Sequence, residues 1–260
     1  MNDEDIRKYK ETQNYEESQI YKGIHGSEEY QSNIEDNINN IKEKVAAAAQ
    51  RAGRNPDEIR IIAVTKNVEP LRILEAINAG ILDLGENRVQ ELVDKITVIN
   101  RDINWHMIGH LQKNKVKYII DKIKMIHSLD NIELAREINV RAEKVQRVID
   151  VLIQVNVAEE ETKYGIYRHQ LMDFIKEISN YRNIRVKGLM TIAPKVQDPN
   201  DVRPVFQELR KIFIDISRKN IDNIDMDFLS MGMSNDFEVA IEEGANIIRI
   251  GTSIFGKRTA

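Results

Sequence analysis

The chain has 260 residues, 42% of them apolar, and a net charge of −4, and this apolar content suffices for one large core. It contains no cysteine, which excludes disulfides and thiolate chemistry and fits a reducing cytoplasm. No apolar run approaches the roughly 20 residues of a membrane-spanning helix, so we expect a soluble protein without a membrane partner.

Residues 1–29 are predicted to form an acidic extension, either a flexible tail or a loosely docked helix. They contain eight acidic and four basic residues and so account for the whole net charge, which leaves residues 30–260 balanced. A balanced body does not attract nucleic acid through bulk charge, and we expect no nucleic-acid partner. The extension lacks the apolar centre of a secretory signal and is too acidic for a transit peptide.

An amphipathic helix is predicted after the extension. Ser32 followed by Glu35 fits a capping box at its start, and Gly53 fits the left-handed residue beyond its end. We expect this helix to pack on the barrel predicted below, whose bottom it can cover. Its apolar stripe has three- and four-residue spacing and consists of Ile34, Ile38, Ile41, Val45, Ala49 and Ala52.

Eight apolar segments are predicted to be strands, and all but the last are followed by a helical pattern. This alternation favours a single-domain α/β fold, a (β/α)8 TIM barrel spanning residues 30–260, for which about 250 residues is the usual size. An open doubly wound sheet is the alternative, but no G-x-G-x-x-G follows the first strand. The predicted strands are residues 59–64, 81–84, 104–108, 124–129, 148–155, 185–192, 227–229 and 246–250.

The carboxyl ends of barrel strands gather at one mouth, where ligands bind. Lys66 follows the first strand, and an amine held there can condense with an aldehyde, although an ordinary solvated lysine is the alternative. Arg249 and Gly251 share one face of the last strand, and a guanidinium flanked by isoleucines needs an acceptor.

Two segments suit a phosphate group. Residues 230–234 read SMGMS and lead into a helix near Asn235, and residues 251–253 read GTS after the last strand. Glycines let an anion approach backbone N–H groups, and barrels commonly hold phosphate after strands seven and eight. The plainer interpretation is that Ser234 caps its helix and the glycines form turns.

A lysine on strand one, an arginine on strand eight and a phosphate cradle together fit pyridoxal 5′-phosphate (PLP), the vitamin B6 cofactor. PLP offers an aldehyde to Lys66, a ring nitrogen to Arg249 and a phosphate to the two loops.

Eight strings occur in one order along the chain: AVTK (63–66), GENRVQE (85–91), WHMIGHLQKNK (105–115), HSLD (127–130), LIQVN (152–156), KYGI (163–166), GLMTI (188–192) and LSMGMSNDFEVAIEEGANIIRIGTSIFGKR (229–258). Together they resemble the pyridoxal phosphate homeostasis protein family over about residues 32–258, which leaves residues 1–29 outside the resemblance. Thr65 stands where serine is frequent in the family, and His110 where proline is frequent.

The resemblance implies a barrel similar to the alanine racemase N-terminal domain and an intracellular role in PLP homeostasis. PLP-dependent apoenzymes are candidate acceptors of the cofactor, and we expect a monomer or weak dimer. The implied cofactor-binding residues are Lys66 as the Schiff base, Arg249 at the pyridine nitrogen, Ser230, Gly232, Ser234, Gly251 and Thr252 around the phosphate, and Asn87 and Met190 at the ring or aldehyde side.

We expect a PLP carrier rather than an enzyme, with no catalytic residues, because an arginine donating to the pyridine nitrogen weakens the ring as an electron sink. The chain also ends at Ala260, without the further domain from which racemases draw their second base. The alternative is a PLP-dependent amino-acid racemase or lyase in which His110, His127 or Tyr164 is the second base. A third possibility is a barrel that binds another phosphorylated metabolite.

Three further groups invite a functional interpretation. His106 and His110 are four residues apart, but Gly109 lies between them and a third ligand is not evident, so we predict no metal site. Lys163 either assists cofactor entry or transfer or is a plain surface lysine. The basic segment 112–117 is predicted to be a solvated helix face.

Overall fold

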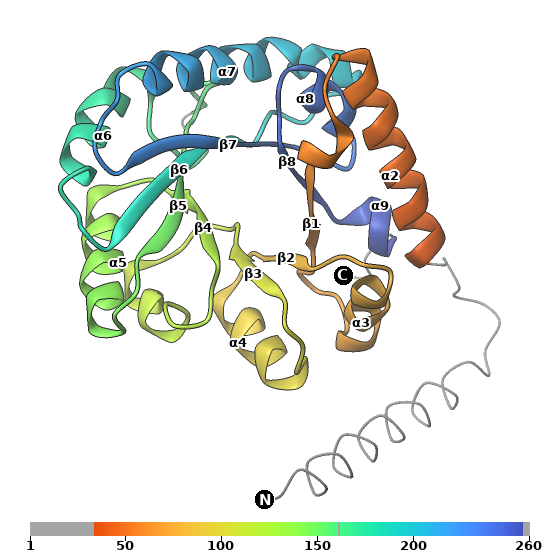
Figure 1. Cartoon of the computed structure of the whole chain (residues 1–260), viewed down its shortest axis with the longest axis horizontal. Coiled ribbons are helices and arrows are strands. Elements are labelled where there is room, and N and C mark those ends of the chain that lie inside the picture. Colours follow the sequence, from red (N-terminus) through yellow and green to blue (C-terminus); the bar gives the residue numbers. More distant parts are fainter. Residues whose placement is uncertain (1–33, 161, 257–260) are drawn as a thin grey trace, which may run out of the picture. The chain divides into compact units, whose positions relative to one another are not determined.

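The computed structural model describes residues 34–160 and 162–256, which form a closed barrel of eight parallel strands in chain order (Figure 1). Because β1 pairs with both β2 and β8, the predicted barrel is confirmed and the open sheet is wrong. Ser32, the proposed cap, and the acidic extension lie outside the described residues. The strands are β1 (Arg60–Val64), β2 (Asp83–Glu86), β3 (Asn104–Met107), β4 (Met125–Leu129), β5 (Ile149–Gln154), β6 (Ile184–Met190), β7 (Ile224–Met233) and β8 (Ile247–Ile250).

Helices surround the strands. The prediction that the last strand has no helix after it was wrong, since the short α9 follows β8, and β3 is followed by a 3₁₀ helix that carries the basic segment 112–117. Among the described helices, none combines the length and the apolar character needed to cross a bilayer. The α-helices are α2 (Ile34–Arg51), α3 (Pro70–Asn78), α4 (Val89–Val98), α5 (Ile132–Lys144), α6 (Leu171–Ile178), α7 (Arg203–Ser217), α8 (Phe237–Glu242) and α9 (Thr252–Phe255). The 3₁₀ helices are η1 (Pro56–Glu58), η2 (Lys113–Tyr118), η3 (Arg168–Gln170) and η4 (Pro199–Val202).

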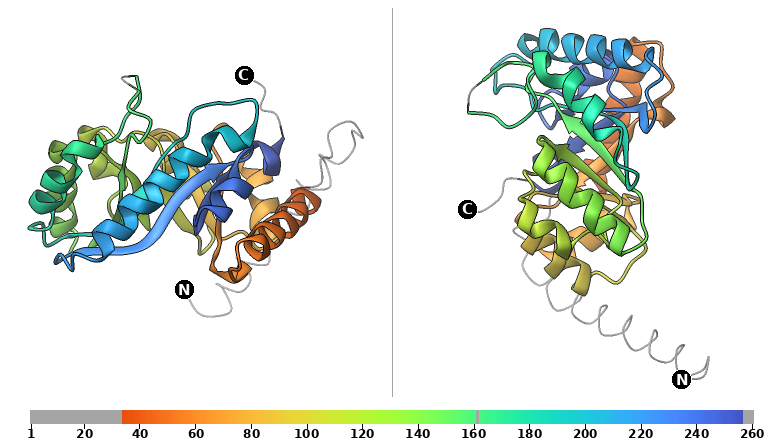
Figure 2. Two further views of the ribbon diagram at one scale, coloured as in Figure 1. Left: turned by 90° about the horizontal axis from the view of Figure 1, so that it is seen from above. Right: turned by 90° about the vertical axis from the view of Figure 1, so that its left-hand side faces the viewer.

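Helix α2 runs along the outer wall of the barrel, beside α3, α8 and α9, rather than across the bottom (Figure 2). Near its start Asn37 donates to the carbonyl of Ile254 in α9 at 2.9 Å. At its end Arg51 pairs with Glu238 and Glu242 of α8. The apolar stripe predicted from the sequence thus covers the wall between α3 and α8, and Gly53 follows it with φ +65°.

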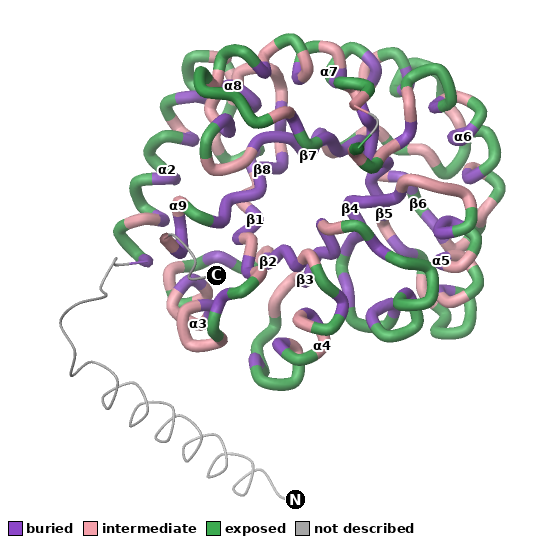
Figure 3. Tube along the Cα trace, turned by 180° about the vertical axis from the view of Figure 1, so that it is seen from behind, coloured by how far each residue is buried: buried purple, intermediate pink, exposed green. Residues whose placement is uncertain are grey.

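The apolar core has two layers, and most strand residues are buried (Figure 3). The larger layer lies between the strands and the helices. The smaller one fills part of the barrel interior and contains Met125, Leu152 and Met190, with Phe228 packed against them. The guanidinium of Arg60 lies 5.1 Å from the centre of the Phe228 ring, close to where the strands begin.

Strands β2 and β7 differ most from prediction. Strand β2 is displaced toward the C-terminus and includes Gly85 and Glu86, because both pair with β3. A side chain at Gly85 would crowd Ile62 and Ile108, so this glycine serves packing rather than a turn. Strand β7 continues through Met233, which makes Ser230 and Gly232 strand residues rather than loop residues.

Candidate functional site

A cavity of about 700 Å³ opens at the carboxyl ends of the strands. The chain reaches this mouth from β1, β2, β7 and β8 because all strands are parallel and each ends there. Six of the residues singled out from the sequence line it: Lys66, Asn87, Ser234, Arg249, Gly251 and Thr252.

The other three predicted binding residues lie beside the cavity without lining it. Met190 is fully buried in the inner apolar cluster with Met125 and Leu152. Ser230 is also fully buried, and its hydroxyl accepts a hydrogen bond from Arg249. Gly232 has φ +91°, and a Cβ there would lie 2.5 Å from the Cβ of Ala240, so its backbone brings β7 close against α8.

Arg249 is the buried cation of the site, with 4% of its surface exposed. Its Nη1 donates to Ser230 Oγ at 2.6 Å and its Nη2 to the carbonyl of Thr191 at 2.8 Å. Burial lowers the pKa of the guanidinium to about 10, although the nearby charge of Asp236 opposes this shift, so the group stays charged at neutral pH. A fixed positive charge therefore stands in the cavity wall.

Backbone N–H groups at the start of α9 converge on the hydroxyl of Ser234. Gly251 and Ser253 each donate to Ser234 Oγ at 3.3 Å. These hydrogen bonds are long. The two N–H groups and the hydroxyls of Ser234 and Thr252 together form a set of donors suited to phosphate oxygens. Asp236 also lines the cavity, where burial raises the pKa of its carboxyl group while the N–H of Met233 and the charge of Arg249 oppose that rise.

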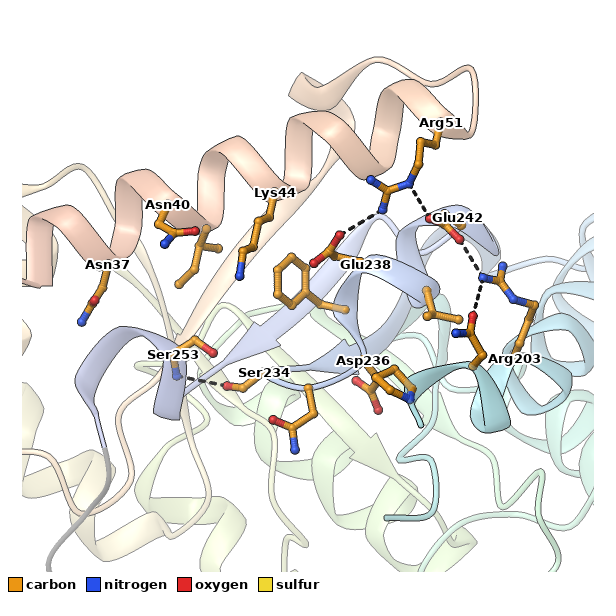
Figure 4. A pocket seen from close by; sticks show the side chains of 16 residues that line it. Asn37, Asn40, Lys44, Arg51, Arg203, Ser234, Asp236, Glu238, Glu242 and Ser253 are labelled. Atoms are coloured by element: carbon orange, nitrogen blue, oxygen red, sulfur yellow. Dashed lines mark hydrogen bonds and ion pairs between the residues drawn. The ribbon is translucent and has the colours of Figure 1, made fainter. Parts of the chain in front are cut away.

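Ser234 lines both this mouth and a second cavity of about 470 Å³ on the outside of the barrel. Figure 4 shows this outer cavity between α2, α8 and α9, with Ser234 bonded to Ser253 in its wall. Arg51 and Arg203 are both paired with Glu242 there. Two of the three cations that line the outer cavity are therefore paired with acidic neighbours, and the third is Lys44.

A buried ion pair holds the backbone on either side of Lys66. Lys95 Nζ donates to Glu86 Oε1 and to the carbonyl of Thr65, each at 2.6 Å. Thr65 Oγ1 also donates to Glu86 Oε1 at 2.6 Å, and Glu91 accepts from both Lys95 and the N–H of Asn67. Both neighbours of Lys66 in the chain are thus tied to one network that the sequence analysis missed.

None of the candidate second bases lines the cavity that Lys66 lines. His110 pairs with Asp130 at 3.3 Å, and its ring stacks on Tyr164 with 3.8 Å between centroids. His127 is fully buried, with His106 at one ring nitrogen and Ser230 at the other.

His106 and His110 do not come together as ligands, since His106 bonds Asp83 and His127 in the interior. Across residues 34–160 and 162–256, no cluster of three His, Cys, Asp or Glu side chains suits a metal ion. Lys163, the other lysine considered, pairs with Glu160 at 2.6 Å and is not among the cavity residues.

The loop after β6 supplies cavity residues that the sequence analysis did not select, and one of them is a second lysine, Lys195. Its segment directly follows Ala193 and Pro194, which come after the predicted strand 185–192 and were the available signal. Lys195 is exposed, whereas Lys66 is partly buried. The cavity therefore contains two amines in different surroundings.

Comparison with known proteins agrees with this architecture. The family described as "Alanine racemase, N-terminal domain" matches residues 36–259. Alanine racemase from Corynebacterium glutamicum shares the fold, with a TM-score of 0.65 at 14% identity over 84% of this chain and 61% of that one. PipY of Synechococcus elongatus PCC7942, solved with PLP bound, is 31% identical, with a TM-score of 0.73 over 83% of this chain and 100% of PipY.

A curated relative covers nearly the same length. The pyridoxal phosphate homeostasis protein of Aquifex aeolicus is 46% identical over 222 residues, which is 85% of this chain and 96% of the relative. Similarity of this extent over almost the whole relative shows the family, as the motifs along the chain predict. The chain therefore belongs to the pyridoxal phosphate homeostasis protein family.

Proposed function

We propose that this chain binds PLP as a Schiff base on Lys66 and serves PLP homeostasis, without substantial catalytic turnover. The observation that carries this proposal is that one cavity is lined by Lys66, by the buried cation Arg249 and by the donors at the start of α9. The PLP bound by PipY, a relative at 31% identity, supports the same assignment.

The residues fit the three parts of the cofactor. Lys66 is the amine for the aldehyde, and its backbone is held by the Glu86–Lys95 network. Arg249 would face the ring nitrogen, and Ser234, Gly251 and Thr252 would hold the phosphate through hydroxyl and N–H groups. Asn87 would line the ring or aldehyde side. Ser230, Gly232 and Met190 lie behind the cavity wall and would support the residues that line it. PLP, when bound, supplies an electrophilic aldehyde and an electron-withdrawing ring.

Two features favour binding over turnover. A charged guanidinium at the ring nitrogen opposes protonation of that nitrogen, and an unprotonated ring is a weaker electron sink. Racemisation also needs a second acid/base group near the substrate, and the three candidates for it, His110, His127 and Tyr164, are absent from the cavity lining, where the titratable side chains besides Lys66 and Arg249 are Lys195 and Asp236. A PLP-dependent racemase or lyase is the alternative function. A barrel for a different phosphorylated metabolite would bind through the phosphate donors alone.

A transfer assay run beside an amino-acid racemase assay distinguishes these functions. We expect the PLP-loaded protein to restore activity to a PLP-dependent apoenzyme while racemising alanine and serine no faster than free PLP. The Lys66→Ala variant, carried through the same loading and desalting, should transfer little. Racemisation at ordinary enzymatic rates, about 1–1000 per second, would establish the enzyme instead. If Lys66→Ala transferred as much PLP as the wild type, the proposed Schiff base on Lys66 would be contradicted.

The proposal extends to partners and compartment. Apoenzymes that need PLP are the proposed acceptors, and the protein is proposed to act as a monomer or weak dimer. The lack of cysteine favours a reducing compartment such as the cytoplasm.

A further inference from the structure

A line of hydrogen-bonded polar side chains crosses the interior of the barrel. It begins at Asp83 on β2 and passes through His106 on β3 and His127 on β4 to Ser230 on β7. The successive distances are 2.9 Å from Asp83 Oδ1 to His106 Nε2, 3.0 Å from His106 Nδ1 to His127 Nε2, and 3.2 Å from His127 Nδ1 to Ser230 Oγ. Ser230 then accepts from Arg249 on β8 at 2.6 Å, so a carboxylate at the strand starts is joined to the cation at the mouth.

All hydrogen bonds along the line are donated in one direction, toward Asp83. Burial would raise the pKa of Asp83, but His106 and Arg60 lower it below the usual value, so the carboxylate only accepts. His106 therefore donates from Nε2. Burial also lowers the pKa of His106 and of His127, which keeps both rings neutral with one proton each.

The remaining donors follow from these assignments. With its proton on Nε2, His106 accepts at Nδ1 from His127 Nε2–H, and His127 Nδ1 must accept the hydroxyl proton of Ser230. The Ser230 oxygen is then turned to accept from Arg249 Nη1. Each polar atom along the line has a partner, and reversing any one bond would set two donors or two acceptors against each other.

Stability alone does not account for this arrangement. Barrel interiors are usually filled by bulky branched apolar residues, and buried polar groups cost free energy unless every one is bonded. Apolar side chains of similar volume would serve the core as well. The line ends at the side chain that, on the proposed function, faces the ring nitrogen of PLP.

We propose that the Asp83–His106–His127–Ser230 line positions Arg249 for the ring end of the cofactor, which makes His106 and His127 positioning residues. This inference rests on the proposed function of the cavity. The line holds Nη1 while the carbonyl of Thr191 holds Nη2 at 2.8 Å, so the guanidinium plane is fixed from two sides. The N–H groups not used in these bonds remain for an acceptor in the cavity.

The first test reads the histidines in the protein without cofactor. Long-range ¹H–¹⁵N NMR spectra should show both His106 and His127 as neutral rings protonated on Nε2, and the Asp83→Asn variant should show a mixture, because an amide can also donate. Nδ1-protonated or doubly protonated rings in the wild-type protein would overturn the inference. This measurement does not depend on PLP binding.

The second test measures how substitutions in the line, away from the cavity lining, change PLP binding. We expect PLP affinity to fall about tenfold in His127→Gln and about threefold in Asp83→Asn, with a shifted visible absorption band in both. The matched control is Asp150→Asn. Like Asp83, Asp150 lies near the start of its strand and has a similar exposed fraction, but it is paired with Arg185 and is not part of the line. Thermal unfolding of each variant separates this effect from loss of fold.

The outcomes are distinct. The positioning role would be overturned if Asp83→Asn and His127→Gln had the same PLP affinity and the same visible absorption band as the control Asp150→Asn. If His127→Gln does not fold, the comparison of Asp83→Asn with Asp150→Asn decides. A wild-type protein that gains no visible band with PLP would refute the proposed function, and the NMR result would then decide whether the line has the inferred direction.

Discussion

Replacing Lys66 with alanine should abolish the visible absorption band that appears when PLP is added to the protein. A Schiff base needs a primary amine, and the Glu86–Lys95 network holds the backbone beside this one. The phosphate donors and Arg249 remain, so weak binding should persist with an affinity about 100-fold lower, or about 2.7 kcal/mol. Spectrophotometric titration with PLP measures both effects.

Lys195→Ala is the matched control, because it removes the other lysine from the same cavity. This side chain is exposed and has no part in the network beside Lys66, so the band and affinity should stay close to those of the wild type. A band that survives in Lys66→Ala and disappears in Lys195→Ala would assign the Schiff base to the loop after β6.

Lys95→Met should produce the largest loss of stability among single lysine substitutions in the described part of the chain. Glu86 has no exposed surface, and Lys95 is its cationic partner at 2.6 Å. Removing the lysine leaves a buried carboxylate uncompensated, which costs about 3–5 kcal/mol. Because Lys95 also holds the carbonyl of Thr65, the affinity for PLP should fall in the molecules that stay folded.

Urea denaturation measures this loss, and Lys176→Met is the control. Lys176 pairs with Asp173 at 3.4 Å on the exposed face of α6, and such pairs contribute at most about 1 kcal/mol. The double variant Glu86→Gln/Lys95→Met should recover part of the loss, since the amide carries no charge. Equal midpoints for Lys95→Met and Lys176→Met would contradict the role given to the buried pair.

The barrel was predictable because a local sequence pattern indicates each strand and most of the helices. The alternation of apolar runs with amphipathic segments identified all eight strands. The errors at β2 and β7 came from treating glycine as a turn signal. Gly85 and Gly232 instead lie in strands where a Cβ would collide with Ile62 or Ala240.

The site was predictable where it consists of strand ends, because parallel strands in a closed barrel bring those ends together. Lys66, Ser234 and Arg249 meet in one cavity for this reason. The Glu86–Lys95 pair left a faint signal, since Lys95 falls on the buried stripe of α4 with Val89 and Leu92.

The interior line left no such signal. Asp83, His106, His127 and Ser230 belong to four strands, and their contacts depend on the register between strands and on distances across the closed barrel. Register of this kind is set by the packing of the whole barrel rather than by any local pattern.

Covalent attachment at Lys66 is tested most directly by borohydride reduction of the PLP-loaded protein followed by peptide mapping. Reduction converts the Schiff base to a stable secondary amine, which mass spectrometry locates on one residue. We predict a pyridoxyl phosphate label on the peptide that contains Lys66 and none on the peptide that contains Lys195. A folded, PLP-loaded protein whose Lys66 peptide stays unlabelled would contradict the proposed function.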